Sequence, residues 1–443
     1  MTVESVNSSC VTVLGAQWGN EGKGKIVEFL SRKADVCARF NGGSNNIHTI
    51  SLNVSTGKCV VGRSIGSIDS TKTSITLGLF PLGVSNKACK LVFGNGMVLH
   101  LPTLLREISA IQSVFDPNVL QRMYISTRAH IVFDFHQEVD GIFDGLRGGS
   151  SLGTTRMGAG PAYSTKTIRN GLRLGDLFSE RNIVREKIAE LALYFTRYNT
   201  TLAPIDVDAV VDSHLKMLEV IRPCIVDTVA LMSSFRSLNV VCEGANSFMS
   251  DVDFGTYPYV TSSNTTSGSA CIGLGIPPTR ISSVIGVCKA YTTRAQHWFP
   301  SGAEMDSATA QKIATRGNEI STVDGSVRRV GWLDLVQVKY ACGICGFDEL
   351  AITKLGVLCG LDRVGIVTKY VNWDVERLGY PATDEEFKAI VPLVEYVPGW
   401  SNINDENAKR FIAFVERFTH TRVMYVQVGD PETVLTDADI ITI

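Results

Sequence analysis

The stretch Val11-Thr-Val-Leu-Gly-Ala-Gln-Trp-Gly-Asn-Glu-Gly-Lys-Gly-Lys25 decides the fold of this chain of 443 residues. Its apolar start, residues 11–14, predicts a buried strand, and the pattern over residues 26–30 predicts a helix. A glycine-rich turn between strand and helix lets backbone N–H groups bind phosphate oxygens, and its two lysines add positive charge. The spacing differs from the standard phosphate loop, because Gly24 stands where Ser or Thr is required. The turn favours phosphate binding, with an ordinary strand-to-helix connection as the alternative.

Composition places the chain among folded globular proteins. Hydrophobic residues make up 44%, charged residues 19%, and the net charge is −2 at pH 7. No global positive field therefore points to nucleic acid or to an anionic membrane. No apolar run reaches the roughly 20 residues that cross a bilayer, and residues 1–10 lack a signal-peptide core. We expect a cytoplasmic protein without nucleic-acid or membrane partners.

The eleven cysteines are odd in number and scattered, which indicates free thiols in a reducing compartment. Cys342-Gly-Ile-Cys345 is a single Cys-x-x-Cys pair. A zinc site needs a second pair or histidines close to the first. Buried structural thiols are therefore favoured over a metal or redox role.

Apolar runs alternate with helical patterns along most of the chain. We expect strands at residues 90–93, 123–125, 238–241, 281–287, 350–354 and 364–369, and helices at 102–114, 182–197 and 206–220. This alternation favours a mainly parallel sheet with helices on its faces. The chain shows no repeat and no long linker, so we expect residues 1–443 to form a single α/β domain. Residues 141–153, rich in glycine and serine, are expected to be the least ordered.

Two further loops carry groups suited to chemistry. Residues 41–49 follow a strand-like run at 36–40 and combine amides, a hydroxyl and the imidazole of His48. This imidazole suits an acid or an oxyanion stabiliser, with a simple loop cap equally open. Residues 261–266 are six consecutive hydroxyl or amide side chains, which suit either a phosphate site or a plain turn.

Gly19-Asn-Glu-Gly-Lys-Gly-Lys25 resembles the Gly-Asp-Glu-Gly-Lys-Gly-Lys signature of adenylosuccinate synthetases. The similarity runs from about Val11 to Val428 and is closest to the eukaryote-type members, as in residues 128–141. It implies the adenylosuccinate synthetase fold, an α/β fold with a large mostly parallel central sheet, distantly related to phosphate-loop NTPases. It also implies a ligase reaction of AMP biosynthesis with Mg²⁺ as cofactor. In that reaction GTP phosphorylates the O6 of IMP, and the amine of L-aspartate displaces the phosphate.

The resemblance assigns roles by matched position. The catalytic positions are His48 and Asn20, which stands where the family has its aspartate base. The positions that bind GTP and its phosphates are Gly19, Asn20, Glu21, Gly22, Lys23, Gly24, Lys25, Ile47, His48, Thr49, Lys354, Leu355, Gly356, Gln427, Val428 and Gly429. The IMP-binding positions are Asn45, Asn46, Thr155, Arg169, Asn246 and Thr261. The aspartate-binding positions are Ser326 and Arg328, and the metal positions are Asn20 and the Ile47 backbone carbonyl.

Arg169 matches an arginine that reaches the phosphate in the neighbouring subunit, so the resemblance implies a homodimer. The ordinary alternative for a lone arginine is a solvated surface position.

The chain departs from the family pattern at several of these positions. Asn20 replaces the base, and an amide has no basic lone pair for the N1 proton of IMP. Ile47 replaces a glycine whose carbonyl helps to hold Mg²⁺, and Ser326 replaces an arginine that bridges aspartate and nucleotide. Gly356 replaces the carboxylate that reads guanine. Asp324 adds a negative charge near the site for a dicarboxylate.

Three functions stay open at this point. The first is a working ligase on IMP. The second is a ligase with changed nucleotide specificity, for dGMP or ATP, because phage relatives that act on dGMP also lack the aspartate. The third is an inactive homologue with a binding or regulatory role.

Overall fold

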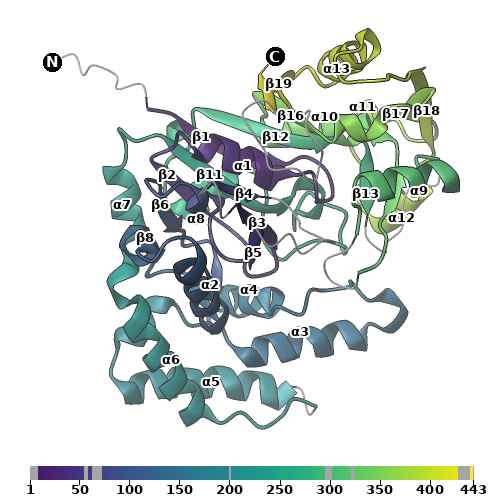
Figure 1. Ribbon diagram of the computed structural model, residues 1–443. Coiled ribbons are helices and arrows are strands. Elements are labelled where there is room, and N and C mark those ends of the chain that lie inside the picture. Colours follow the sequence, from purple (N-terminus) through teal and green to yellow (C-terminus); the bar gives the residue numbers. More distant parts are fainter. Residues whose placement is uncertain are drawn as a thin grey trace.

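A ten-stranded sheet forms the centre of the molecule in the computed structural model, which describes residues 8–53, 58–61, 72–198, 201–294, 302–320, 325–427 and 440–442 (Figure 1). Its strand order is β10-β8-β6-β2-β11-β1-β12-β16-β19-β20. All neighbours in this order pair in parallel, except β19 and β20, which are antiparallel. The fold is therefore α/β with a large, mostly parallel central sheet, as the sequence predicts.

The strands of the central sheet match most of the predicted apolar runs. They are β1 (Cys10–Gly15), β2 (Val36–Arg39), β6 (Lys90–Phe93), β8 (Met123–Ser126), β10 (Ile225–Val226), β11 (Val240–Ser247), β12 (Ser283–Lys289), β16 (Glu349–Thr353), β19 (Arg422–Gln427) and β20 (Ile440–Thr442). The strand expected at 238–241 starts two residues later and extends to Ser247. Its second half, Glu-Gly-Ala-Asn-Ser, is too polar to show in an apolar pattern.

Both faces of the sheet are buried, because successive residues of its strands enter two separate apolar clusters. Val13 of β1 packs with helices α1 (Lys23–Ser31), α2 (Leu101–Val114), α5 (Arg181–Tyr198) and α6 (Val207–Ile221). Leu14 packs on the other face, with α7 (Thr228–Ser234), α8 (Ser267–Leu274), α10 (Leu335–Cys345) and α13 (Glu406–Thr419). Burial on both faces explains why these strands read as continuous apolar runs.

Smaller sheets and shorter helices surround this core (Figure 1). Three strands form one small sheet: β15 (Leu333–Asp334), β17 (Arg363–Tyr370) and β18 (Pro392–Pro398). Three more form another: β3 (His48–Asn53), β4 (Lys58–Val61) and β5 (Lys72–Leu77). The two-stranded sheets pair β7 (Val98–His100) with β9 (His130–Val132), and β13 (Thr292–Arg294) with β14 (Arg329–Gly331). The remaining α-helices of the described ranges are α3 (Asp134–Leu146), α4 (Ala159–Thr167), α9 (Ser307–Arg316), α11 (Val375–Leu378) and α12 (Asp384–Ala389).

The expectation of weak order at 141–153 is wrong for its first part. Helix α3 continues to Leu146 although Gly141 and Gly145 lie inside it. Asp144, near its end, binds the following loop by accepting from Ser151 Oγ at 2.8 Å and from Leu152 N at 2.7 Å. These contacts and the buried face of α3 outweigh the low helix propensity of glycine.

Cys342 and Cys345 both lie in α10 and are buried. Burial raises the pKa of Cys342 to about 11 and that of Cys345 to about 12, so both thiols stay protonated at neutral pH.

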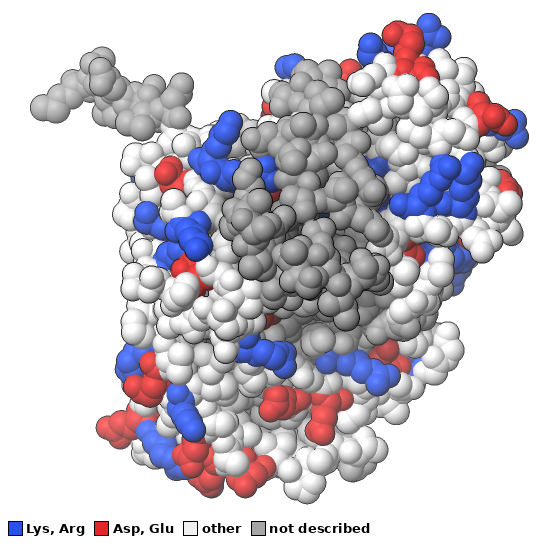
Figure 2. All heavy atoms as spheres, viewed as in Figure 1, with Lys and Arg blue, Asp and Glu red and all other residues white. Residues whose placement is uncertain are grey.

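Cations and anions alternate on the surface formed by α5 and α6, on the face drawn in Figure 2. Arg181 pairs with Asp208 and Asp212, and Arg185 pairs with Asp208. This part of the surface therefore offers no continuous positive field. Among the described residues, no helix combines the length and the apolar character that crossing a membrane requires.

Candidate active site

The turn between β1 and α1, residues 19–25, is called the phosphate loop here after its sequence motif, and its backbone is left-handed at three positions. Gly19, Asn20 and Gly22 have φ angles of 113°, 59° and 80°, in the left-handed region. The turn places the N-terminus of α1 at the carboxyl end of a central strand. The free N–H groups and the dipole of a helix N-terminus attract an anion at such a position.

A buried carboxylate braces this loop from inside. Glu21 accepts hydrogen bonds from Gly19 N at 2.8 Å and Gln17 N at 3.2 Å. Its second oxygen accepts from Ser247 Oγ at 2.8 Å, and its backbone carbonyl accepts from Thr353 Oγ1. The loop is therefore held in shape by β11 and β16 without a ligand.

Two lysines lie in the first turn of α1, and both are buried. Burial lowers the pKa of Lys23, and the carboxylates of Glu21 and Glu243 oppose this shift. Cations at a helix N-terminus oppose the helix dipole, so their burial there is unfavourable until an anion binds. Buried lysines at this place are the pattern that the resemblance associates with phosphate binding.

The loop at residues 41–49 joins the other polar loops together. Asn41 Nδ2 donates to the carbonyl of Asn264 at 2.9 Å, in the run of hydroxyl and amide residues. Gly42 N donates to the hydroxyl of Tyr163 at 2.9 Å, in the loop and helix at 153–163. The side chain of His48 reaches the phosphate loop. Segments 19–25, 41–49, 153–163 and 261–266 therefore lie close together.

His48 packs so closely on the phosphate loop that residue 24 must be glycine. A Cβ at position 24 would lie 2.9 Å from His48 Nδ1. The other ring nitrogen, Nε2, lies 3.0 Å from Asn46 Nδ2 and 3.9 Å from Glu243 Oε1. Burial, and then the charges of Lys23 and Arg39, lower the pKa of His48 well below its ordinary value. The imidazole is therefore neutral at pH 7.

Two further asparagines lie against the glycines of the loop at residues 41–49, Asn45 beside Gly43 and Asn246 beside Gly42. Asn45 Oδ1 accepts from Gly43 N at 3.1 Å. Asn246 has a φ of 62°, and its buried Oδ1 has no hydrogen-bond partner among the described residues. A buried acceptor of this kind is costly unless a ligand donor reaches it.

Asn20, at the base position, contacts Arg328. With its oxygen facing the guanidinium, the Asn20 carboxamide accepts from Arg328 Nη1 at 2.7 Å and from Nη2 at 3.2 Å. Ser326 lies in the described stretch that leads to Arg328. The structure thus brings the phosphate loop against the segment where the resemblance places the aspartate substrate.

The segment at residues 353–356, where the resemblance places recognition of the base, is held by a buried ionic cluster around Glu319. Lys354 Nζ donates to Glu319 Oε1 at 2.6 Å, and Lys289 Nζ lies 3.2 Å from the same oxygen. The hydroxyl of Tyr291 donates to it at 2.7 Å. Burial alone raises the pKa of Glu319, but the two lysines outweigh it and lower the pKa to about 2. Gly356 follows in a short 3-10 helix, Leu355–Leu358.

The remaining sequence-predicted positions are less closely gathered. Thr155 is partly buried in the loop before α4, and Arg169 is exposed after α4 with a φ of 67°. Thr261 N donates to Ser250 O at 2.8 Å. Gln427 is buried at the end of β19, beside β16. Ile47 is partly buried, only the backbone of Thr49 is described, and Val428 and Gly429 lie outside the described residues.

Sequence reasoning missed several buried charges of the site. Arg39, Glu243, Lys289 and Glu319 are each at most 1% exposed. Arg39 and Lys289 carry a visible signal, because each is a cation inside or at the end of an apolar strand. Glu319 carries none, since its partners become apparent only in the fold.

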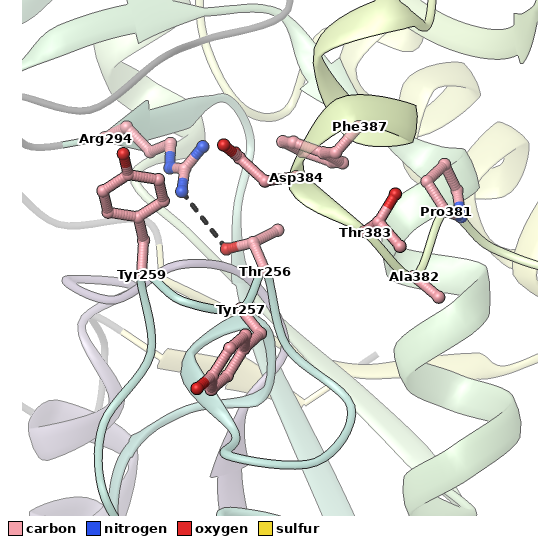
Figure 3. A pocket seen from close by; sticks show the side chains of 9 residues that line it. All are labelled: Thr256, Tyr257, Tyr259, Arg294, Pro381, Ala382, Thr383, Asp384 and Phe387. Carbon is pink, nitrogen blue, oxygen red and sulfur yellow. Dashed lines mark hydrogen bonds between the residues drawn. The ribbon is translucent and has the colours of Figure 1, made fainter. Parts of the chain in front are cut away.

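A small pocket lies between α12 and the segment 256–259, beside Arg294 at the end of β13 (Figure 3). It is lined by Thr256, Tyr257, Tyr259, Arg294, Pro381, Ala382, Thr383, Asp384 and Phe387. The carboxylate of Asp384 points toward Arg294 across the pocket. The pocket therefore separates α12 from the segment that ends β13.

Comparison with known proteins decides the family. The family model for adenylosuccinate synthetase matches residues 12–434. This chain belongs to the adenylosuccinate synthetase family. An adenylosuccinate synthetase of Trichoplax adhaerens is 39% identical over 438 residues, which covers 96% of this chain and 94% of that protein. Adenylosuccinate synthetase 1 of Laccaria bicolor is 41% identical over 435 residues, covering 95% and 97%.

Solved structures agree with this assignment of the adenylosuccinate synthetase fold. The fully ligated adenylosuccinate synthetase of Plasmodium falciparum superposes with a TM-score of 0.84 at 34% identity, covering 98% of this chain and 99% of that one. The succinoaminodeoxyadenylate synthetase of cyanophage S-2L, bound to dGMP and dATP, superposes with a TM-score of 0.60. At 18% identity, with 98% and 95% coverage, the phage enzyme supports the fold alone.

Proposed function

We propose that this chain is a ligase of the adenylosuccinate synthetase type. It acts in the cytoplasm as a homodimer and joins L-aspartate to the purine nucleotide IMP, with cleavage of a nucleoside triphosphate. The observation that carries the proposal is the buried anion site at the N-terminus of α1. There the buried Lys23 and Lys25 flank Gly24, which packs on His48, and the site lies among loops that hold nucleotide-binding positions of the family.

In this proposal the phosphate loop and its lysines bind the phosphoryl group that is transferred. The Asn46 amide donates to His48 Nε2 at 3.0 Å, which leaves the imidazole proton on Nδ1. Nδ1 is the nitrogen packed against the phosphate loop. Its N–H is placed to donate to a phosphoryl oxygen and to stabilise charge that develops there.

The unpartnered Oδ1 of Asn246 and the loop at 261–266 serve the monophosphate. Asn246 Oδ1 accepts from the purine or the ribose, and Thr261 and Thr155 donate to phosphate oxygens. Arg328 and Ser326 hold the aspartate carboxylates, and Lys354 and Gln427 flank the base of the triphosphate.

Mg²⁺, when bound with a triphosphate, would supply charge neutralisation for the transferred phosphoryl group. The residues present fit it poorly as direct ligands. The Asn20 oxygen faces the Arg328 guanidinium, a cation, and no group of three His, Cys, Asp or Glu in the described ranges is arranged for a metal. The Ile47 carbonyl remains as a protein ligand, so the phosphate oxygens would supply most of the others.

A nucleotide-binding protein without ligase activity is the second candidate. The contact of Asn20 with Arg328 favours it, because position 20 then holds an amide that neither accepts a proton nor is free to move. The ligase could also have a changed nucleotide specificity, for dGMP or ATP. Gly356 favours this form of the first candidate, because it offers no carboxylate to guanine.

Calorimetry and turnover together test the proposal. IMP, dGMP, GTP and ATP are titrated with Mg²⁺, and phosphate release is measured with and without L-aspartate. We expect a triphosphate and a monophosphate to bind, and phosphate release to require aspartate. Lys23→Met should abolish both, while Lys216→Met, on the exposed face of α6, should change neither. Binding without turnover would establish the second candidate, and binding of dGMP with ATP the changed specificity. Binding of no nucleotide would overturn the proposal.

A further inference from the structure

The hydroxyl of Thr256 lies where three segments of the chain meet (Figure 3). Its oxygen accepts from Trp18 Nε1 at 3.3 Å and from Arg294 Nη2 at 3.2 Å. The same hydroxyl donates to Met249 O at 3.3 Å. A threonine hydroxyl has one donor and two lone pairs, so these three contacts use its whole hydrogen-bonding capacity.

The first segment is the phosphate loop. Trp18 is followed directly by Gly19 and Asn20, which begin the left-handed turn. Its indole is fixed at one edge by Thr256, and Arg294 Cζ lies 5.3 Å from its ring centroid. An indole held at its edge and on its face gives the start of the loop a fixed anchor.

The second segment is the end of β13, where Arg294 is buried between two aromatic side chains. Besides Trp18, its Cζ lies 5.7 Å from the ring centroid of Phe387 in α12. Burial lowers the pKa of Arg294 to about 10, which keeps it charged at neutral pH. The guanidinium therefore links α12 to Trp18, and Thr256 sets its orientation.

The third segment is the chain from Ser250 to Thr266, which ends in the run of hydroxyl and amide residues. Thr256 N donates to Met249 O at 3.0 Å, and Tyr259 N donates to Thr256 O at 2.9 Å. Thr261 N in turn donates to Ser250 O at 2.8 Å. A displacement of Thr256 is therefore passed to Thr261 by short backbone contacts.

We propose that Thr256 is a positioning residue that couples the phosphate loop to the loop at 261–266. What the two loops bind rests on the proposed function, whereas the coupling itself does not. Because the hydroxyl is bonded to Trp18, next to the first loop, and the Thr256 backbone is bonded within the segment that leads to the second, ordering one loop orders the other. A triphosphate at the first loop and a monophosphate at the second would then strengthen each other's binding, by equal factors.

Hydrogen exchange of the free protein tests the coupling without any ligand. Thr256→Val keeps the shape of the side chain and removes the hydroxyl, and Thr256→Ser restores it. Thr228→Val is the matched control, because the Thr228 hydroxyl is buried but has no hydrogen-bond partner among the described residues. We expect Thr256→Val to speed exchange at least about threefold in peptides covering both 16–22 and 257–266. Thr256→Ser and Thr228→Val should exchange like the wild type.

Trp18→Phe covers the case in which Thr256→Val does not fold. It replaces the indole by a smaller ring, which removes the N–H that bonds Thr256 and keeps an aromatic face for Arg294, and it should loosen the same two peptides. Wild-type exchange in either peptide, in whichever of these two variants folds, would overturn the proposal.

Calorimetry with GDP and IMP then separates this proposal from the proposed function. We expect Thr256→Val to weaken both nucleotides at least about fivefold and to lower their mutual coupling, with rescue by Thr256→Ser. If the wild type binds neither nucleotide but Thr256→Val loosens both peptides, the proposed function fails and the coupling stands. If both nucleotides bind and Thr256→Val binds them as the wild type does, the coupling is overturned.

Discussion

With the Asn20 carboxamide turned so that its oxygen faces Arg328, that oxygen accepts from Nη1 at 2.7 Å and from Nη2 at 3.2 Å. Asn20 is exposed at the tip of the phosphate loop with a φ of 59°, a conformation that asparagine adopts more readily than most residues. The contact brings the phosphate loop against the irregular segment that precedes β14. The family's base position is therefore occupied by a group whose acceptor is already satisfied by a cation.

Asn20→Asp should raise kcat with IMP, GTP and aspartate by less than about tenfold, although a general base is typically worth about 10²–10⁴-fold. A carboxylate at position 20 would pair with Arg328 in a charge-assisted contact that lowers its basicity. Ser326 and Gly356 would also remain unsuited to aspartate and guanine. Steady-state kinetics of the single variant measure this.

The double variant Asn20→Asp with Ser326→Arg is the second test. It also restores the arginine that the family has at position 326, which bridges aspartate and nucleotide. We expect the double variant to exceed the product of the two single effects. A gain of a hundredfold or more from Asn20→Asp alone would show that the missing base was the sole limitation.

The central part of the fold could be predicted from the sequence, because strands buried on both faces leave continuous apolar runs. Residues 11–14 and 90–93 are such runs, and they form β1 and β6. The polar end of β11 and the glycine-containing helix α3 could not be predicted, since tertiary hydrogen bonds stabilise them.

The loops of the candidate site could be located from their motifs. The buried residues that hold these loops in place could not be predicted. Glu319 carries no motif that links it to Lys289 and Lys354, and its role follows only from the fold. The same holds for the contact of Asn20 with Arg328, which are far apart in the sequence.

Glu319→Gln should destabilise the protein by about 3–5 kcal/mol, because it leaves two lysines near one another without their carboxylate. Chemical denaturation monitored by circular dichroism measures the change. Glu304→Gln is the matched control, since Glu304 pairs with Arg329 at 2.7 Å in a partly exposed position. An exposed pair contributes about 1 kcal/mol or less. Equal effects of the two substitutions would contradict the role of burial.

Buried histidines should make the protein less stable below neutral pH. Burial, and then His100 and His130, lower the pKa of His136 to about 3, and burial with Lys166 and Arg173 lowers that of His130 to about 4. Both are neutral in the folded state and gain a proton near pH 6.5 when unfolded. Their stabilisation is complete above about pH 6.5 and is lost as the pH falls toward the folded values.

Each of these two histidines should cost about 2 kcal/mol of unfolding free energy between pH 7 and pH 5. His136→Gln keeps a side-chain acceptor for Phe133 N. It should reduce the loss of unfolding free energy between pH 7 and pH 5 by about 2 kcal/mol, the share of one histidine. Denaturation at several pH values measures the slope. His420→Asn, at an exposed helix end, should leave it unchanged.

Light scattering at micromolar concentration should give twice the mass of one chain, because Arg169 matches a residue that acts across a dimer interface. Arg169 is exposed after α4, where it is accessible to a second subunit. If it serves the partner's site, Arg169→Ala and Lys23→Met are each inactive alone. Mixed one to one, they should recover about a quarter of the wild-type activity, because hybrid dimers contain one intact site. A monomer, or mixed subunits without recovery, would exclude this arrangement.

The triphosphate site should discriminate GTP from ATP by less than about tenfold, a difference of roughly 1.4 kcal/mol. The phosphate loop keeps its glycines and lysines, whereas Gly356 offers no side chain to the base. Lys354 cannot replace the missing acceptor, because its Nζ is a donor that Glu319 and the carbonyl of Gly317 already hold. The site should therefore keep its affinity for the phosphates while it loses most of its selectivity for the base. Competition of GTP and ATP for a fluorescent triphosphate analogue measures the ratio of the two affinities.

Gly356→Asp should shift this ratio toward GTP, because a carboxylate accepts from N1–H and the 2-amino group of guanine and is left buried and unpaired with adenine. Leu361→Asp, at a partly exposed position after the same 3-10 helix, adds the charge without that contact and should leave the ratio unchanged. A strong GTP preference in the unmodified chain would mean that another residue, with Gln427 the nearest candidate at the end of β19, reads guanine.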